Sequence, residues 1–136
     1  DVIVGFPGET EEEFALTKAF LKKVNFYEIH VFKYSRRTGT AAAAMQEQVP
    51  EKVKAQRSGE ILELTKKQAK AFREHYIGRE AEVLLEERRE IEGHVLLTGH
   101  TKDYVKIAVD AADGSLRENR IVTVLVKEFL TDEILI

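Results

Sequence analysis

Cysteine and tryptophan are absent from this chain of 136 residues, and proline occurs only twice. Without cysteine, the chain can form neither disulfide bonds nor metal sites built from thiolates. Its four histidines stand at positions 30, 75, 94 and 100, and no pair has a spacing typical of metal ligands. We therefore expect that this chain alone binds no metal ion.

Long apolar segments are missing as well. Hydrophobic residues make up 43% of the sequence and charged residues 33%, and no run approaches the roughly 20 apolar residues that a membrane-spanning helix needs. We also expect no signal peptide. The sequence therefore predicts a cytoplasmic protein without a membrane partner.

Positive charge is scarce in the second half of the chain. Residues 1–77 contain 13 Lys and Arg against 11 Asp and Glu, whereas residues 78–136 contain 8 against 13. Proteins bind nucleic acid without sequence preference mainly by neutralising phosphates with Lys and Arg. The acidic second half therefore argues against tight, sequence-independent RNA binding by that half alone.

The first part of the chain predicts a β-α-β unit. Residues 1–5 (DVIVG) are typical of a buried strand, and Thr10 with Glu13 has the pattern of a capping box at a helix start. We expect a helix over 11–24 and a second, parallel strand over the aromatic run 26–34. Two parallel strands make an incomplete sheet, so we expect the chain to be a piece of a larger enzyme. We also expect non-native homo-oligomers to form through its unpaired strand edges.

The pattern changes along the rest of the chain. Residues 35–48 predict a loop, and Pro50 predicts the first turn of a long helix that reaches about residue 77. After Gly78, a good helix stop, we expect five short strands at 79–87, 91–98, 103–109, 119–128 and 133–136, with one break over 111–119. Five short strands suit a small closed or nearly closed barrel. The predicted fold class is therefore α/β followed by all-β.

The loop after the first strand is a candidate binding element. Gly5 and Gly8 allow the backbone to approach a ligand closely, and Pro7 stiffens the turn. From these residues alone, a purely structural β-α turn is the favoured interpretation. A phosphate-binding loop is the weaker one, because neither Gly-x-x-x-x-Gly-Lys nor Gly-x-Gly-x-x-Gly is present.

Two arginines follow the second predicted strand. Arg36 and Arg37 stand just past the strand's carboxyl end, where barrel enzymes build their active sites. They are candidates for bidentate hydrogen bonds to a substrate, for instance to its carboxylate. The alternative is a solvated arginine pair.

Further candidate RNA contacts lie in the second half of the chain. Tyr104, beside Lys102 and Lys106, lies on the predicted outer face of a strand, which suits either stacking on an unpaired base or a plain strand tyrosine. Arg88 and Arg89 are a second pair, in the predicted first hairpin, where neighbouring glutamates offset their charge.

Four segments of the chain resemble one known family. They are residues 1–14 (DVIVGFPGETEEEF), 30–45 (HVFKYSRRTGTAAAAM), 48–57 (QVPEKVKAQR) and 99–107 (GHTKDYVKI). In order and spacing they are similar to the C-terminal half of the MiaB-like family, the radical S-adenosylmethionine tRNA methylthiotransferases. Together they extend over nearly the whole chain.

This resemblance implies three parts: residues 1–48 as the end of a truncated radical S-adenosylmethionine (β/α) barrel, 49–77 as a connector helix, and 78–136 as a five-stranded, OB-like TRAM barrel that binds RNA. It implies contact with S-adenosylmethionine for Val4, Gly5, Phe6, Pro7 and Gly8. The resemblance also implies contacts with the substrate tRNA, and for Arg36 and Arg37 with its anticodon loop. The residues expected to make these contacts are Arg36, Arg37, Thr38, Arg88, Arg89, Lys102, Tyr104 and Lys106.

The chemistry of the family needs groups that this chain lacks. A Cys-x-x-x-Cys-x-x-Cys motif holds a 4Fe-4S cluster that cleaves S-adenosylmethionine, and a second 4Fe-4S cluster takes part in sulfur insertion. This chain has no cysteine for either cluster. We therefore expect it to contain no catalytic residue, to bind no cofactor by itself and to be inactive alone.

The Ser-Arg-Arg-Thr-Gly-Thr run at 35–40 indicates a branch of the family. It is most similar to the branch that methylthiolates threonylcarbamoyladenosine at position 37 of tRNA, since the isopentenyladenosine branch more often has Ser-Pro-Arg-Pro-Gly-Thr. The alternatives are an enzyme acting on isopentenyladenosine, one acting on a ribosomal protein aspartate, and a stand-alone RNA-binding module. The truncated β-α-β unit speaks against the last of these.

Overall fold

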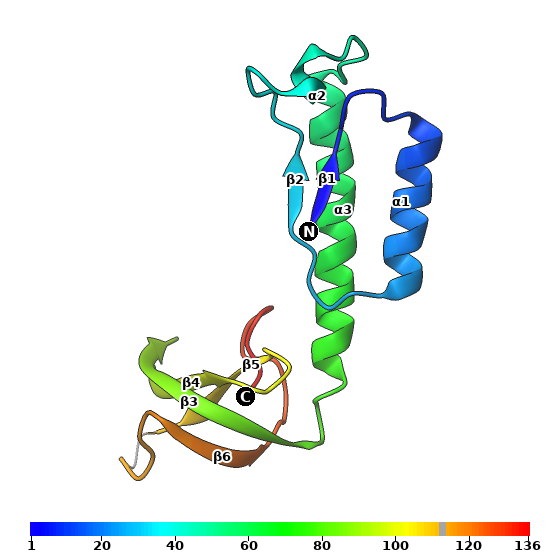
Figure 1. The fold of residues 1–136 in the computed structure, drawn as a ribbon. Coiled ribbons are helices and arrows are strands. Elements are labelled where there is room, and N and C mark those ends of the chain that lie inside the picture. Colours follow the sequence, from blue (N-terminus) through cyan, green and yellow to red (C-terminus); the bar gives the residue numbers. More distant parts are fainter. Residues whose placement is uncertain (112–113) are drawn as a thin grey trace. The chain divides into compact units, whose positions relative to one another are not determined.

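The computed structural model of the chain describes residues 1–111 and 114–136. These residues divide into two compact units, Asp1–Ala69 and Lys70–Ile136. The elements in chain order are β1 (Val2–Val4), α1 (Glu11–Val24), β2 (Val31–Lys33), α2 (Ala41–Ala44), α3 (Glu51–Glu74), β3 (Glu80–Ile91), β4 (His94–His100), β5 (Lys106–Asp110) and β6 (Arg120–Leu125) (Figure 1).

The first unit is built on two parallel strands. β1 and β2 pair in parallel, with Val2 opposite Val31, which confirms the predicted arrangement. The second strand is shorter than the predicted range 26–34. The residues before Val31 are the connection from α1, and within it Ile29 donates its N–H to Thr65 Oγ1 of α3 at 3.0 Å. That amide is therefore satisfied by a helix rather than by a strand.

Helix α1 begins and ends as the sequence predicts. Thr10 Oγ1 accepts a hydrogen bond from Glu13 N at 3.2 Å, and Glu13 Oε2 accepts one from Thr10 N at 2.9 Å. This capping box satisfies two amides that a helix start leaves free. The helix ends at Val24, before Asn25 in the left-handed conformation with φ 58°, a common helix stop.

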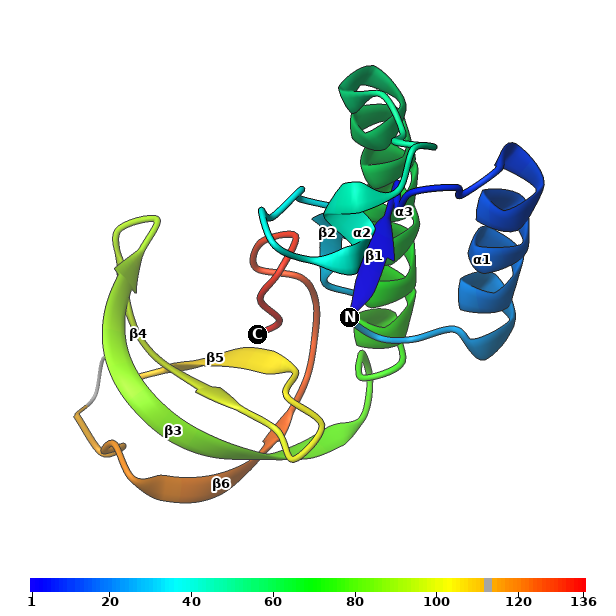
Figure 2. The ribbon, with the colours of Figure 1, turned by 45° about the horizontal axis from the view of Figure 1, so that its top comes forward.

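One face of the β1–β2 sheet forms the core of the first unit. Helices α1 and α3 pack on that face, and both ribbon views show α3 beside the two strands (Figure 1, Figure 2). Ile3 and Phe32 lie on the opposite face and are 56% and 53% exposed. The core residues are Val4, Phe14, Leu21, Ile29 and Ile61, with Val2, Val31 and Leu64 packed against them.

Two helices follow β2. The predicted loop over 35–48 contains the short helix α2, which Thr40 caps by accepting a hydrogen bond from Ala43 N at 3.2 Å. The long helix α3 starts directly after Pro50, as predicted. It ends slightly before residue 77, the predicted end.

The second unit is an antiparallel sheet of four strands in the order β5-β4-β3-β6. The sequence predicts a five-stranded barrel that is closed or nearly closed, but no closed barrel is found in the described residues, and the prediction of a strand at 133–136 is wrong. Leu135 makes isolated bridges only, one of them to Ile107 of β5. The next residue, Ile136, exchanges backbone hydrogen bonds with Glu128 of its own segment. Leu135 accepts a hydrogen bond from Ala108 N and donates one to Lys106 O of β5, but this pairing stops at one residue and forms no fifth strand.

Strand β3 is bent by a β-bulge between Leu85 and Glu87. Gly99 of β4 lies against this bulge, and a Cβ atom there would come within 1.9 Å of Leu84 O. Glycine is therefore required at this position. The predicted break over 111–119 includes residues 112 and 113, which lie outside the described residues.

The first strand of the second unit extends beyond its predicted end at residue 87. Glu92 and Gly93 have positive φ values of 53° and 80° and form the turn between β3 and β4. Arg88 and Arg89 lie within β3, opposite Leu97 and Leu96 of β4, and thus in the first hairpin, as predicted. The strand runs on past residue 87 because the bulge resets its pairing with β4.

The core of the second unit combines strand and terminal residues. Its fully buried side chains are those of Val83, Leu85, Leu97, Val105, Ile107, Val126 and Leu135. Val105 and Ile107, which flank Lys106, are fully buried as predicted, but Ala108 of the predicted outer face is only 2% exposed. Within residues 1–111 and 114–136, no helix combines the length and the apolar character needed to cross a membrane.

Candidate functional site

The loop after β1 turns sharply at two glycines. Gly5 has φ 72° and Gly8 has φ 87°, in the region that favours glycine. Gly5 donates its N–H to Glu9 Oε1 at 2.9 Å, and Gly8 donates its N–H to the carbonyl of Glu47 at 2.8 Å. The loop shape is thus fixed by hydrogen bonds within the chain.

A side chain at Gly5 would collide with the protein itself. A Cβ atom there would come within 2.3 Å of Lys54 Cγ, and one at Gly8 would lie 3.3 Å from Glu47 Oε2. Packing against α3 therefore requires glycine at position 5 whether or not a ligand approaches. Contact of Val4–Gly8 with S-adenosylmethionine stays a prediction.

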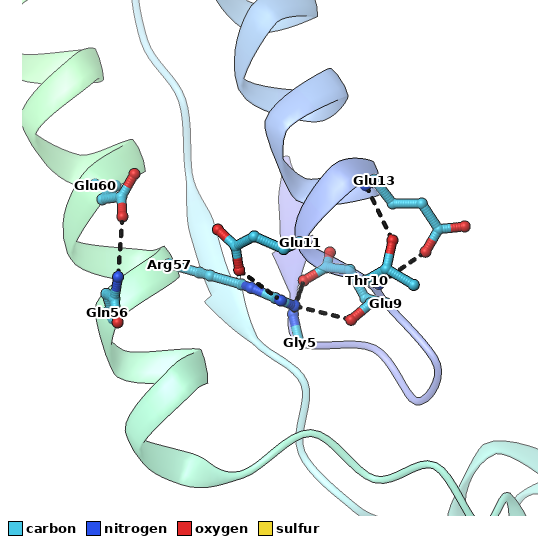
Figure 3. A network of polar contacts seen from close by, with 8 residues as sticks. All are labelled: Gly5, Glu9, Thr10, Glu11, Glu13, Gln56, Arg57 and Glu60. Atoms are coloured by element: carbon cyan, nitrogen blue, oxygen red, sulfur yellow. Dashed lines mark hydrogen bonds and ion pairs between the residues drawn. The ribbon is translucent and has the colours of Figure 1, made fainter.

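A buried ion-pair cluster attaches this loop to α3 (Figure 3). Arg57 is 5% exposed. Its Nη1 donates to Glu9 Oε1 at 2.5 Å and to Glu9 O at 3.1 Å, and its Nη2 donates to Glu11 Oε2 at 3.2 Å. Burial alone lowers the pKa of Arg57, but hydrogen bonds and charges from Glu9 and Glu11 outweigh burial and raise the pKa above its ordinary value.

A second buried cation, Lys54, lies one turn before Arg57 and is 4% exposed. Its Nζ donates to Tyr34 O at 3.1 Å and to Glu51 Oε1 at 2.7 Å, and lies 5.3 Å from the centre of the Tyr34 ring. The hydrogen bond and charge of Lys54 lower the pKa of Glu51. Phe6, which is 45% exposed, packs against the same tyrosine in a T-shaped ring pair with the ring centres 5.3 Å apart. Lys54 thus holds the residue that follows β2.

The loop after β2 contains the predicted arginines. Arg36 Nε donates to Ala43 O at 2.9 Å, which orients the guanidinium, while its Nη atoms have no hydrogen-bond partner among the described residues. Arg36 and Thr38 line an open depression of about 680 Å³ beside α2. Arg37 is exposed but does not line it, and its carbonyl accepts a hydrogen bond from Thr40 Oγ1 at 2.8 Å. The structure therefore brings Arg36 and Thr38 together.

Both loops lie at the carboxyl ends of the parallel strands. Tyr34 donates its N–H to Val4 O at 2.9 Å, and the hydrogen bond from Gly8 to Glu47 joins the first loop to the segment after α2. Figure 1 shows both loops at the top of the first unit. Ligands in α/β folds bind at this edge of the sheet. The predicted cofactor contacts and Arg36 therefore lie at one edge.

In the second unit, the turn before β5 exposes an aromatic side chain. Tyr104 is 78% exposed and has φ 62°, a conformation uncommon for a bulky residue. With Lys102, His100, Leu84 and Ile121 it lines a depression of about 340 Å³ on the sheet. The structure thus brings together Lys102 and Tyr104 of the predicted RNA contacts.

The charges around this depression are mixed. Glu82 and Glu86 also line it, and Glu86 Oε2 lies 2.7 Å from His100 Nδ1. Asp103 in the adjacent turn accepts a hydrogen bond from the Tyr76 hydroxyl at 2.6 Å. This surface is better suited to stacking a base on an aromatic ring than to binding a phosphate.

The remaining predicted RNA contacts lie outside that depression. Lys106 is 4.0 Å from Glu87, and Arg89 forms an ion pair with the same glutamate at 2.6 Å. Arg88 donates long hydrogen bonds, 3.5 and 3.4 Å, to two backbone carbonyls. All three cations thus have contacts within the chain, and their contact with RNA stays a prediction.

The sequence interpretation missed Glu9, Lys54 and Arg57. A signal was available, because Lys54 and Arg57 stand seven and four residues before the core residue Ile61 and continue its helical stripe. Charged residues on a buried stripe need charged or hydrogen-bonding partners. Among the described residues, no group of His, Cys, Asp or Glu is arranged to hold a metal ion.

The chain thus combines an α/β unit, whose loops meet at one sheet edge, with an antiparallel β unit. No protein-family model matches it. It is 43% identical over 117 residues to the threonylcarbamoyladenosine tRNA methylthiotransferase MtaB of Bacillus subtilis, a match of 85% of this chain and 26% of the relative. A tRNA-2-methylthio-N(6)-dimethylallyladenosine synthase of Acetivibrio thermocellus is 43% identical over 116 residues, 85% of this chain and 24% of the relative.

A third relative is the MtaB enzyme of Treponema pallidum, 44% identical over 87 residues, which are 64% of this chain and 18% of that protein. The chain spans about a quarter of the length of the first two relatives. It belongs to the MiaB-like family of tRNA methylthiotransferases.

Proposed function

We propose that this chain is the C-terminal part of a radical S-adenosylmethionine tRNA methylthiotransferase. The whole enzyme would add a methylthio group to position 2 of N6-threonylcarbamoyladenosine at position 37 of tRNA. The identity of 43% to a relative of that name, over 85% of this chain, supports the reaction class. A synthase named for dimethylallyladenosine has the same sequence identity to this chain, 43%. The choice of substrate therefore depends on the residues of the site.

The placement of Arg36 is the observation that carries the choice of substrate. The threonylcarbamoyl group has a carboxylate, whereas an isopentenyl group is apolar. Arginine binds carboxylates through two parallel hydrogen bonds, and the Nη atoms of Arg36 are available for them at the 680 Å³ depression. Position 36 and position 38 are the two places where the run at 35–40 differs from the Ser-Pro-Arg-Pro-Gly-Thr form.

The first unit would supply one wall of the cofactor site. In this proposal residues 1–48 end the radical S-adenosylmethionine barrel and 49–77 form the connector helix. The exposed ring of Phe6 and the backbone of Gly5–Gly8, at the carboxyl edge of the sheet, fit contact with S-adenosylmethionine. Clusters of the 4Fe-4S type are held by cysteine thiolates, which this chain does not have. Cluster ligands would therefore come from other parts of the enzyme.

The second unit would bind the tRNA as a TRAM domain over residues 78–136. Exposed Tyr104 beside Lys102 offers a ring for an unpaired base and a cation for a phosphate. Lys106, Arg88 and Arg89 would contribute positive charge around it. The mixed charges near Tyr104 favour binding that is guided by the first unit rather than tight binding by this unit alone.

Mass spectrometry of tRNA nucleosides tests the proposed function. The gene for the full-length protein is deleted and then restored. We expect 2-methylthio-threonylcarbamoyladenosine to disappear on deletion and to return on restoration. Loss of 2-methylthio-isopentenyladenosine instead would show that the enzyme acts on isopentenyladenosine in tRNA. Loss of a methylthiolated aspartate would show that it acts on a ribosomal protein. If the levels of all three modifications stay unchanged, the proposal that the protein is a methylthiotransferase is contradicted, and a stand-alone RNA-binding module is the alternative that remains.

A further inference from the structure

We propose that Lys54 and Arg57 are positioning residues, which set the two loops at the carboxyl edge of the first unit and thereby the affinity for S-adenosylmethionine. This inference rests on the proposed function, because it assigns the cofactor to that edge. Both cations stand within the first two turns of α3 and are at most 5% exposed. The connector helix would then be part of the active-site scaffold.

Arg57 fixes the loop after β1 at both of its ends. The carboxylate of Glu9 accepts hydrogen bonds from Gly5 N, at the start of the loop, and from Arg57. Arg57 also binds the backbone carbonyl of Glu9, at the end of the loop. Figure 3 shows the guanidinium reaching from α3 to this loop. A shift of Arg57 would therefore move the whole segment that carries Phe6.

Lys54 contacts both strand ends. Its alkyl chain fills the space beside Gly5, where no Cβ could fit, and its ammonium group binds the carbonyl of Tyr34. Tyr34 directly precedes the loop that contains Arg36, and its ring packs against Phe6. One lysine therefore sets the spacing between the proposed cofactor loop and the proposed substrate loop.

Stability alone is a weak reason to bury these two charges. Replacing a buried ion pair by apolar side chains of similar size is often neutral or stabilising. Arg57 Nε is buried and has no hydrogen-bond partner among the described residues, a cost that an apolar side chain would avoid. A positioning role accounts for the pair, since the charges define loop geometry through directed hydrogen bonds.

The test uses the full-length protein and measures its dissociation constant for S-adenosylmethionine together with KM and kcat. Arg57→Met removes the charge and keeps an unbranched apolar side chain. We expect the dissociation constant to rise at least about tenfold, with a smaller change in kcat. Arg57→Lys keeps the charge without the planar fork of donors, and we expect it to recover part of the affinity.

Lys18→Met is the matched control. Lys18 also joins α1 to α3, through a 2.6 Å ion pair with Glu60, but it contacts neither loop. We expect this variant to bind S-adenosylmethionine within about twofold of the wild type, as for loss of a partly exposed pair. Equal losses of affinity in Lys18→Met and Arg57→Met would overturn the positioning role, and so would wild-type affinity in Arg57→Met.

Two further outcomes are decisive. Should Arg57→Met fail to fold, Arg57→Lys decides the matter, because a weaker affinity at wild-type thermal stability supports positioning and an unchanged affinity overturns it. A wild-type protein that binds no S-adenosylmethionine would overturn the proposed function, and this inference with it.

Discussion

Arg57 and Glu9 are joined by two hydrogen bonds although they stand 48 residues apart, one to the carboxylate at 2.5 Å and one to the backbone carbonyl at 3.1 Å. The same carboxylate accepts the N–H of Gly5. A single buried pair therefore closes the loop after β1 and attaches it to α3. Removing one partner of such a pair leaves the other charge buried and uncompensated.

Glu9→Gln tests this pair. The amide keeps the shape of the side chain and removes its charge beside Arg57, so we expect the free energy of unfolding to fall by about 3 kcal/mol. Urea denaturation of the chain measures the change. Glu11→Gln is the control, because Glu11 contacts the same guanidinium but its side chain is 72% exposed, and its loss should cost less than about 1 kcal/mol. If the two variants lose the same free energy of unfolding, burial of Glu9 does not make its ion pair more stabilising than that of Glu11.

Gly5→Ala separates a steric collision from backbone strain. Gly5 and Gly39 both have positive φ, 72° and 85°, and alanine at either position costs about 1–2 kcal/mol in strain. Only at Gly5 would the new Cβ collide, 2.3 Å from Lys54 Cγ, whereas nothing lies within 4 Å at Gly39. We expect Gly5→Ala to be more destabilising than Gly39→Ala by about 1–3 kcal/mol, measured by thermal unfolding. Equal effects would show that Lys54 moves aside freely.

The ion pair of Lys18 and Glu60 predicts a pH dependence of stability. The hydrogen bond from Lys18 lowers the pKa of Glu60 below its ordinary value, although burial opposes the shift. A lowered folded-state pKa gives stability above the ordinary value of about 4.3, and this stability is lost as the pH falls through the folded-state value.

Glu60→Gln should therefore be less stable than the wild type at pH 7, by less than about 1 kcal/mol because the pair is partly exposed. The difference should vanish in strong acid. Urea denaturation across that pH range measures it, and a difference that persists unchanged in acid would contradict the charge as its cause.

Tyr104→Ala tests the exposed ring of the second unit. Stacking on an aromatic ring contributes about 1–3 kcal/mol per base, so we expect the dissociation constant of the full-length protein for its tRNA to rise about tenfold. Tyr104→Phe keeps the ring and should retain affinity within about twofold. Fluorescence anisotropy with a labelled anticodon stem-loop measures both. Since Tyr104 is 78% exposed, folding should be unaffected, and wild-type binding by the alanine variant would exclude stacking.

Local patterns were sufficient to predict much of the first unit. The capping box at Thr10 and the helix over 11–24 are confirmed because their determinants lie within a few residues. The length of β2 was overestimated because an aromatic, β-branched run does not show that Ile29 bonds to α3. That contact depends on a residue 36 positions away, so only the tertiary structure decides it.

The site was only partly predictable for a similar reason. Arg36, Lys102 and Tyr104 could be named from the sequence pattern and Thr38 from the family resemblance, and the structure places Arg36 and Thr38 at one depression and Lys102 and Tyr104 at another. Lys54 and Arg57, which hold the loops, are buried in the core. In a sequence, a lysine and an arginine on a helix normally indicate a face exposed to solvent. Their burial follows from long-range contacts with Tyr34 and Glu9.

The most direct test of the central claim compares two activities of the full-length enzyme carrying Arg36→Ala. The claim is that Arg36 binds the substrate at the carboxyl edge of the first unit and takes no part in the cleavage of S-adenosylmethionine. We expect 2-methylthio-threonylcarbamoyladenosine formation to fall at least about tenfold, while formation of 5′-deoxyadenosine from S-adenosylmethionine is retained. Arg37→Ala should have a smaller effect, because Arg37 does not line the depression. Equal loss of both activities in Arg36→Ala, or full modification of tRNA, would contradict the account.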